Sequence, residues 1–166
     1  MKRTIEGNGM QLTQYTDYSL RVLIYLTRFG GDGATIAEIA EYFHISRNHL
    51  MKVVNGLSSA GFIVTTRGKG GGMELARPAN TIMVGEVVRA TESDFHLAEC
   101  FDLGHDQCVI TRCCALKSVL HVARRDFFKV LDRYSIAEAA GARLPPLEFS
   151  SPGGFGTTTE EVLPSR

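Results

Sequence analysis

The fold of this chain is decided by residues 35–76, which read TIAEIAEYFHISRNHLMKVVNGLSSAGFIVTTRGKGGGMELA. Thr35 and Glu38 have the spacing of a capping box, so we expect a short helix to start there and to end near Phe43. A tight turn follows, and Ser46 caps a third helix. The apolar face of that helix consists of Leu50, Val53, Val54 and Leu57.

A β-hairpin is predicted directly after this pair of helices. Residues 62–66 are rich in strand-forming side chains, residues 68–72 contain four glycines that favour a turn, and residues 73–76 return as a second strand. Residues 18–29 carry apolar side chains at helical spacing. The resulting order predicts a mostly α-helical winged helix-turn-helix fold with one small β-hairpin.

Charge is distributed unevenly, although the formal net charge is zero. Residues 46–77 contain five basic side chains and a single acid, Glu74, whereas residues 92–106 contain five acids and no lysine or arginine. A basic stretch in a helix-turn-helix and its wing favours binding to the phosphates of DNA. The acidic stretch lies outside that unit.

The first turn of the third helix is the predicted base-contacting element. Arginine can form two hydrogen bonds with guanine, and asparagine can do so with adenine. Lys52 lies one turn later, in a better place for phosphate, and glycines flank the two basic residues of the wing. The residues expected to bind double-stranded operator DNA are Ser46, Arg47, Asn48, His49, Lys52, Arg67 and Lys69. The alternative is a set of solvated polar residues or a protein-binding winged helix.

All four cysteines of the chain lie within fifteen residues, at Cys100, Cys108, Cys113 and Cys114. This spacing differs from the paired C-x2-C pattern of zinc ribbons. Three interpretations remain open: an iron–sulfur cluster, a zinc ion completed by His96 or His105, and a metal-free thiol switch. Adjacent side chains diverge in most backbone conformations, so only one of the last two cysteines is expected to be a ligand.

A heptad pattern follows the cysteines. Its apolar positions are Leu116, Leu120, Ala123, Phe127, Val130 and Tyr134. Such a seam predicts a helix that forms a homodimer, and two-fold dimers match palindromic DNA sites. The alternative is an amphipathic helix that packs only on its own domain.

Other classes of protein are not indicated. No run of about 18 apolar residues could cross a membrane, and the first four residues lack the apolar core of a signal peptide. We therefore expect a cytoplasmic protein, in which thiols stay reduced. No nucleophile–base spacing, phosphate-binding loop or metalloprotease motif indicates an enzyme.

The expected organisation has five parts. Residues 1–9 are a disordered leader, residues 10–90 the DNA-binding domain, and residues 91–114 the cysteine loop. Residues 115–140 form the dimerisation helix and a short terminal helix. Residues 141–166, rich in proline, glycine, serine and threonine, are a disordered tail.

Residues 10–140 resemble the IscR/NsrR family of iron–sulfur winged-helix regulators. Four segments carry the resemblance: LTQYTDY at 12–18, SRNH at 46–49, RGKGGG at 67–72 and CVITRCCALK at 108–117. Together they are most similar to the nitric-oxide-sensitive repressors of that family. The resemblance implies a dimeric repressor whose cluster reacts with nitric oxide and thereby releases promoters of nitric-oxide detoxification genes.

The resemblance also implies a ligand set. The three thiolate ligands fall on Cys100, Cys108 and Cys114, and the fourth ligand is Asp17 of the partner subunit; the competing role of an aspartate here is capping the first helix. The cluster expected is 4Fe–4S, with 2Fe–2S as the alternative. The alternative functions are IscR-like sensing of cluster supply, sensing of redox stress, and a zinc or thiol-switch regulator.

Overall fold

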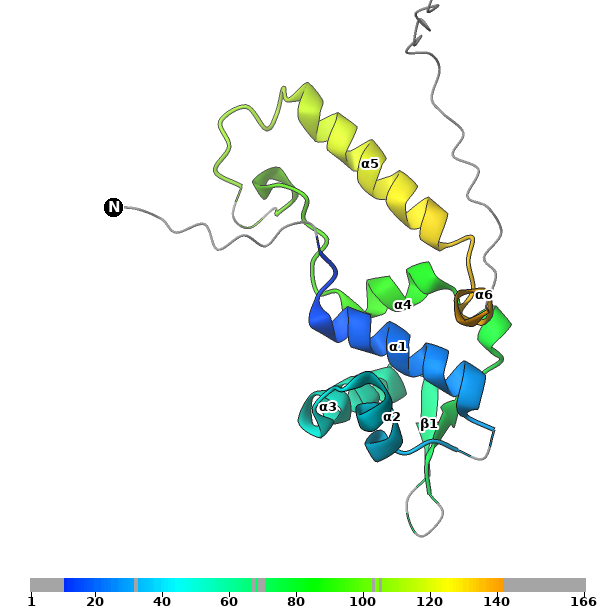
Figure 1. The fold of residues 1–166 in the computed structure, drawn as a ribbon. Coiled ribbons are helices and arrows are strands. Elements are labelled where there is room, and N and C mark those ends of the chain that lie inside the picture. Colours follow the sequence, from blue (N-terminus) through cyan, green and yellow to red (C-terminus); the bar gives the residue numbers. More distant parts are fainter. Residues whose placement is uncertain are drawn as a thin grey trace, which may run out of the picture.

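Three helices and one hairpin form the winged helix-turn-helix in the computed structural model, which describes residues 11–31, 33–66, 68, 71–102, 104 and 106–141. The elements are α1 (Gln14–Phe29), α2 (Ile36–Phe43), α3 (Arg47–Ser59), β1 (Ile63–Thr65) and β2 (Met73–Leu75). They occur in the predicted order, and Figure 1 shows α1 lying across α2 and α3 with the hairpin extending beside them. The proposed leader, and the tail beyond residue 141, lie outside the described residues.

Local capping explains why these helices begin where they do. The Thr35–Glu38 capping box is present, and hydrogen bonds from Thr35 lower the pKa of Glu38. His44 adopts a left-handed conformation, with φ of 55°, at the turn before α3. The Ser46 hydroxyl then accepts a hydrogen bond from the backbone of His49.

The start of α1 differs from the sequence-based expectation. Thr13 is the N-cap and accepts a hydrogen bond from the backbone N–H of Thr16, so the helix begins at Gln14 rather than near residue 18. Several capping residues occur within this short stretch, and the sequence does not rank them. Asp17 therefore lies inside the first turn and does not cap the helix.

The hairpin is antiparallel, with Val64 opposite Glu74. Met73 forms a bridge with Ala34, which joins β2 to the segment before α2. A Cβ atom at Gly72 would lie 3.1 Å from the Gly33 carbonyl carbon, so glycine permits this close approach. The predicted DNA contacts Arg67 and Lys69 lie outside the described residues.

The remaining elements connect this unit to a long helix. They are the 3-10 helix η1 (Ala79–Thr81), α4 (Val84–Thr91), the 3-10 helix η2 (Glu99–Phe101), α5 (Ala115–Leu131) and α6 (Ile136–Ala140). Helix α5 points away from the DNA-binding unit and contacts α4, whereas α6 returns to α1 (Figure 1). Ile136 of α6 is fully buried in the common core, but no residue of α5 is buried. Sequence patterning did not predict the two 3-10 turns.

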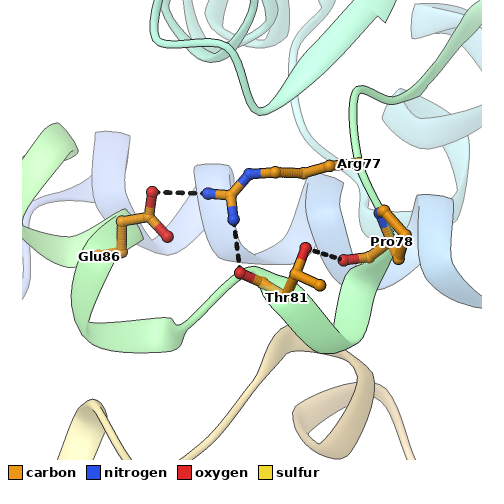
Figure 2. A network of polar contacts seen from close by, with 4 residues as sticks. All are labelled: Arg77, Pro78, Thr81 and Glu86. Carbon is orange, nitrogen blue, oxygen red and sulfur yellow. Dashed lines mark hydrogen bonds and ion pairs between the residues drawn. The ribbon is translucent and has the colours of Figure 1, made fainter.

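A polar network fixes the chain between β2 and α4 (Figure 2). The guanidinium of Arg77 donates to the carbonyl of Thr81 and, at 2.6 Å, to the carboxylate of Glu86 on α4. The same guanidinium lies 5.7 Å from the ring centre of Phe62. The exit of the wing is thereby connected directly to α4.

Candidate DNA-contacting helix and cysteine loop

Helix α3 has one buried face and one exposed face, as a base-contacting helix requires. Leu50 and Leu57 are fully buried, and Val53 and Val54 nearly so. The predicted DNA contacts at Ser46, Arg47, Asn48, His49 and Lys52 are all exposed. Within the described part of the chain, neither Arg47 nor Lys52 is in an ion pair. Both cations can therefore bind DNA without breaking an existing pair.

The first turn of α1 packs directly on α3. A Cβ atom at Gly56 would lie only 1.7 Å from the Tyr15 hydroxyl oxygen, so the tyrosine occupies space that any larger residue would fill. The rings of Tyr18 and His49 lie 6.3 Å apart. Sequence reasoning missed this contact, although an isolated glycine inside a helical pattern is a signal of close packing.

Asp17 lies on this same turn and has an exposed carboxylate. It forms an ion pair with Arg21 one turn later, with N–O distances of 3.0 and 2.8 Å. The two side chains are 44% and 43% exposed, respectively. An exposed pair of this kind contributes only about 0.3–0.5 kcal/mol, so Asp17 can exchange this partner at small cost.

The cysteine loop is folded back on itself by hydrogen bonds next to the cysteines. Glu99, beside Cys100, accepts a hydrogen bond at 2.9 Å from the backbone of Gln107, beside Cys108. The Asp106 carboxylate accepts from the backbone of Cys108 at 3.2 Å and from the Thr111 hydroxyl at 2.8 Å. These bonds bring together the segments that carry the first two predicted thiolate ligands.

The two adjacent cysteines have different surroundings. Cys113 is exposed, and its Sγ lies 3.5 Å from the carbonyl oxygen of Ile110. Cys114 is half-buried at the N-cap of α5. All four cysteines are free thiols. Soft thiolates in one short loop suit iron or zinc.

A metal site also requires that its ligand side chains lie close together. Within the ranges that the structure describes, no three His, Cys, Asp or Glu side chains form a group that could hold a metal ion. Of the histidines considered as zinc ligands, His96 is exposed and His105 lies outside the described residues. The ligand set therefore stays a prediction.

The loop contacts both neighbouring parts of the chain. At its beginning, Glu92 accepts a hydrogen bond at 2.7 Å from the backbone of Thr13, the cap of α1. In its middle, the ring of Phe101 lies 4.4 Å from that of His121 and 4.8 Å from the guanidinium of Arg124, both on α5. A change in this loop can therefore reach the start of α1 and the long helix.

Comparison with known proteins identifies the family. The model of the Rrf2 family, described as an iron-dependent transcriptional regulator, matches residues 12–141. The chain belongs to the Rrf2 family. Relatives that match most of this chain are named HTH-type transcriptional regulator NsrR. The protein of Bacillus subtilis (strain 168) is 48% identical over 130 residues, which cover 78% of this chain and 89% of that protein. The protein of Oceanobacillus iheyensis is 47% identical over 130 residues, covering 78% and 88%.

Solved structures of regulators confirm the predicted fold class of this Rrf2 protein. The oxidized form of Staphylococcus aureus CymR has a TM-score of 0.64 and 26% identity, covering 79% of this chain and 96% of that one. IscR of T. potens has a TM-score of 0.62 and 25% identity, covering 78% and 85%. The family match and the named relatives show that the chain is a DNA-binding transcriptional regulator, which is not a class of enzyme. Among the described residues, no helix is long and apolar enough to span a membrane.

Proposed function

We propose that this Rrf2 protein is a dimeric repressor whose binding to operator DNA depends on an iron–sulfur cluster that senses nitric oxide. The observation that carries the proposal is the cysteine loop, which holds every cysteine of the chain and contacts both α1 and α5. Relatives named NsrR that are 45–48% identical support nitric oxide as the signal. In this proposal, residues 10–90 bind DNA, residues 91–114 hold the cluster, and α5 within residues 115–140 forms the dimer, while the short terminal helix α6 packs on α1.

The proposed ligands are the thiolates of Cys100, Cys108 and Cys114 and the carboxylate of Asp17 of the partner subunit. When bound, the cluster, 4Fe–4S in this proposal, supplies iron that reacts with nitric oxide. The first turn of α1 carries Asp17 and also packs on α3 through Tyr15 and Gly56. A ligand bond to that turn would hold one base-contacting helix relative to the opposite subunit. Its loss would let the two helices leave the fixed half-site spacing that an operator requires.

The proposed dimer surface is an apolar stripe along α5. Its exposed members are Leu116, Val119, Val122, Phe127 and Val130. Three of these belong to the predicted heptad seam, whereas Leu120 and Tyr134 of that seam are half-buried. Exposed apolar side chains in a row along one helix indicate contact with another protein surface. A second copy of α5 would cover them.

The function is tested by measuring operator binding of anaerobically purified protein before and after exposure to nitric oxide. The operator is first selected from random DNA by the untreated protein, and iron and sulfide are counted in the same samples. We expect equal iron and sulfide, tight binding before treatment, and affinity lower by about tenfold or more afterwards, within the usual range of allosteric coupling. Equal affinity for the operator before and after treatment would show that nitric oxide is not the signal. Bound zinc, or reactive thiols without metal, would support the alternatives.

Two variants distinguish a ligand role of Asp17 from its ion pair with Arg21 in this assay. Asp17→Ala should lower both cluster retention and operator affinity if the carboxylate is a ligand of the partner's cluster. Arg21→Gln removes the same ion pair but leaves the carboxylate, so it should retain both properties. If both variants lose these properties, Asp17 acts only through Arg21; if both retain them, Asp17 is not a ligand.

Base contacts and phosphate contacts of α3 should respond differently to substitution. Arg47→Ala should weaken binding to the operator by about 1–3 kcal/mol and leave binding to random DNA nearly unchanged, because a base contact is lost. Lys52→Ala should weaken both and flatten the dependence on salt by about one unit, because a phosphate contact is lost. Titrations at several salt concentrations measure both effects. An equal loss on operator and random DNA in Arg47→Ala would contradict the assignment.

A further inference from the structure

The long helix α5 is joined to the DNA-binding unit mainly at its C-terminal end. The backbone N–H of Val84, the first residue of α4, donates to the carbonyl of Tyr134 at 2.8 Å. Ile136 donates to the carbonyl of Ile82 at 2.8 Å, and Met83 forms a bridge with Ser135. The segment that follows α5 is thus bonded to the segment that begins α4.

One ion pair spans this joint. Arg89 on α4 and Asp132 just after α5 form two parallel hydrogen bonds, of 2.8 and 2.5 Å, between residues 43 positions apart. The pair lowers the pKa of Asp132 and raises that of Arg89, because each charge is hydrogen-bonded to its partner. Both side chains remain more than 40% exposed, so the pair adds little to stability. Two-point contacts of this kind define orientation.

Each partner of this pair also contacts the opposite helix. A Cβ atom at Gly85 would lie 2.1 Å from the Asp132 carboxylate oxygen, so the carboxylate rests against the backbone of α4. On the other side, the Arg89 guanidinium lies 4.6 Å from the ring centre of Phe128 on α5. Asp132 therefore touches α4, and Arg89 touches α5, in addition to their ion pair.

Helix α4 forms a second ion pair one turn earlier. Glu86, three residues before Arg89, binds Arg77 at the exit of the wing (Figure 2). The same short helix thus connects the wing to the helix that we assign to the dimer. A rotation of α5 about this joint would change how one DNA-binding unit faces its partner.

We propose that Arg89 and Asp132 are positioning residues that fix the angle between α5 and the DNA-binding unit, and thereby set the half-site spacing that the dimer recognises. This inference rests on the proposed function. Helix α5 has 17 residues, which at about 1.5 Å each make it about 25 Å long. A rotation of about 10° at one end would move the other by about 4 Å, comparable to the rise of about 3.4 Å per base pair.

The test compares operators with altered spacing. The untreated wild-type protein selects a palindromic operator from random DNA, and two derivatives lengthen or shorten its spacer by one base pair. We expect the wild type to prefer its own spacing by about tenfold or more, the size of the loss that one altered position in a site usually causes. In Asp132→Asn and Arg89→Gln this preference should fall towards one, because the natural operator is bound less tightly while the altered operators are not. Iron content and sedimentation should match the wild type.

Three comparisons make the outcome decisive. Arg125→Gln removes an Arg–Asp pair between neighbours on α5 itself, and it should keep the wild-type spacing preference. Arg89→Lys keeps the charge but not the two-point contact, and should give an intermediate preference even if another variant folds poorly. Wild-type preference in all Arg89 and Asp132 variants would overturn the inference. Failure of the wild type itself to select an operator would instead count against the proposed function.

Discussion

Alanine at Cys100, Cys108 or Cys114 should abolish cluster binding, whereas alanine at Cys113 should leave it intact. Each of the first three substitutions removes one of the thiolates that we propose as iron ligands, whereas Cys113 is the one loop thiol left outside the proposed set. Cys113 is exposed beside the Ile110 carbonyl, whereas Cys114 is half-buried at the start of α5. The expected result is near-zero iron per chain in three variants and wild-type iron in the fourth.

The measurement is iron and sulfide per chain after anaerobic purification, together with the visible absorption spectrum. Because Cys113 and Cys114 are neighbours, the Cys113→Ala variant is a matched control for loss of a thiol from the loop. Full iron in Cys114→Ala together with loss in Cys113→Ala would reverse the assignment of the third ligand. Stoichiometric zinc in the wild-type protein would show that the loop binds zinc and not an iron–sulfur cluster.

Aspartate at Val119 should convert the dimer into a monomer. Val119 is 61% exposed on α5 within one chain, so the substitution should not disturb folding. In a two-fold interface, however, both subunits carry the substitution, and each would bury an unpaired carboxylate among apolar side chains. A penalty of about 3 kcal/mol would weaken association by about a hundredfold.

Analytical ultracentrifugation over a range of protein concentrations measures this effect. Ser118→Asp is the matched control, because it places the same charge on the neighbouring exposed position, outside the apolar stripe. The control should sediment as the wild type does. A folded Val119→Asp protein that remained dimeric at low concentration would show that α5 does not form the interface.

Local signals explain how much of this fold could be predicted. The capping box at Thr35 and Glu38, the Ser46 cap and the glycine-rich wing each depend on a few consecutive residues, so the helix-turn-helix and its hairpin were predictable. The contacts of the apolar face of α5 were harder to predict, because the heptad pattern identifies an apolar seam but not which neighbour covers it. Leu120 is half-buried within the chain, whereas Val119, outside the seam, is exposed.

Contacts between distant residues had no comparable signal. The bond between Thr13 and Glu92 joins positions 79 apart, and that between Arg89 and Asp132 joins positions 43 apart. Each consists of ordinary surface residues that sequence patterning assigns to solvent. For the candidate site, the cysteines themselves were evident from their clustering, but the hydrogen bond between Glu99 and Gln107 that folds their loop was not.

The joint between α4 and α5 also bears on modularity. The chain leaves the core after Thr91 and returns at Asp132, where Arg89 holds it beside the point of departure. Helix α6 then packs on α1 and completes the core. Residues 92–131 are therefore an insertion with adjacent ends, and α4 and α6 both pack on α1 outside it. Sensor chemistry can diversify within such an insertion while the DNA-binding unit keeps its own contacts.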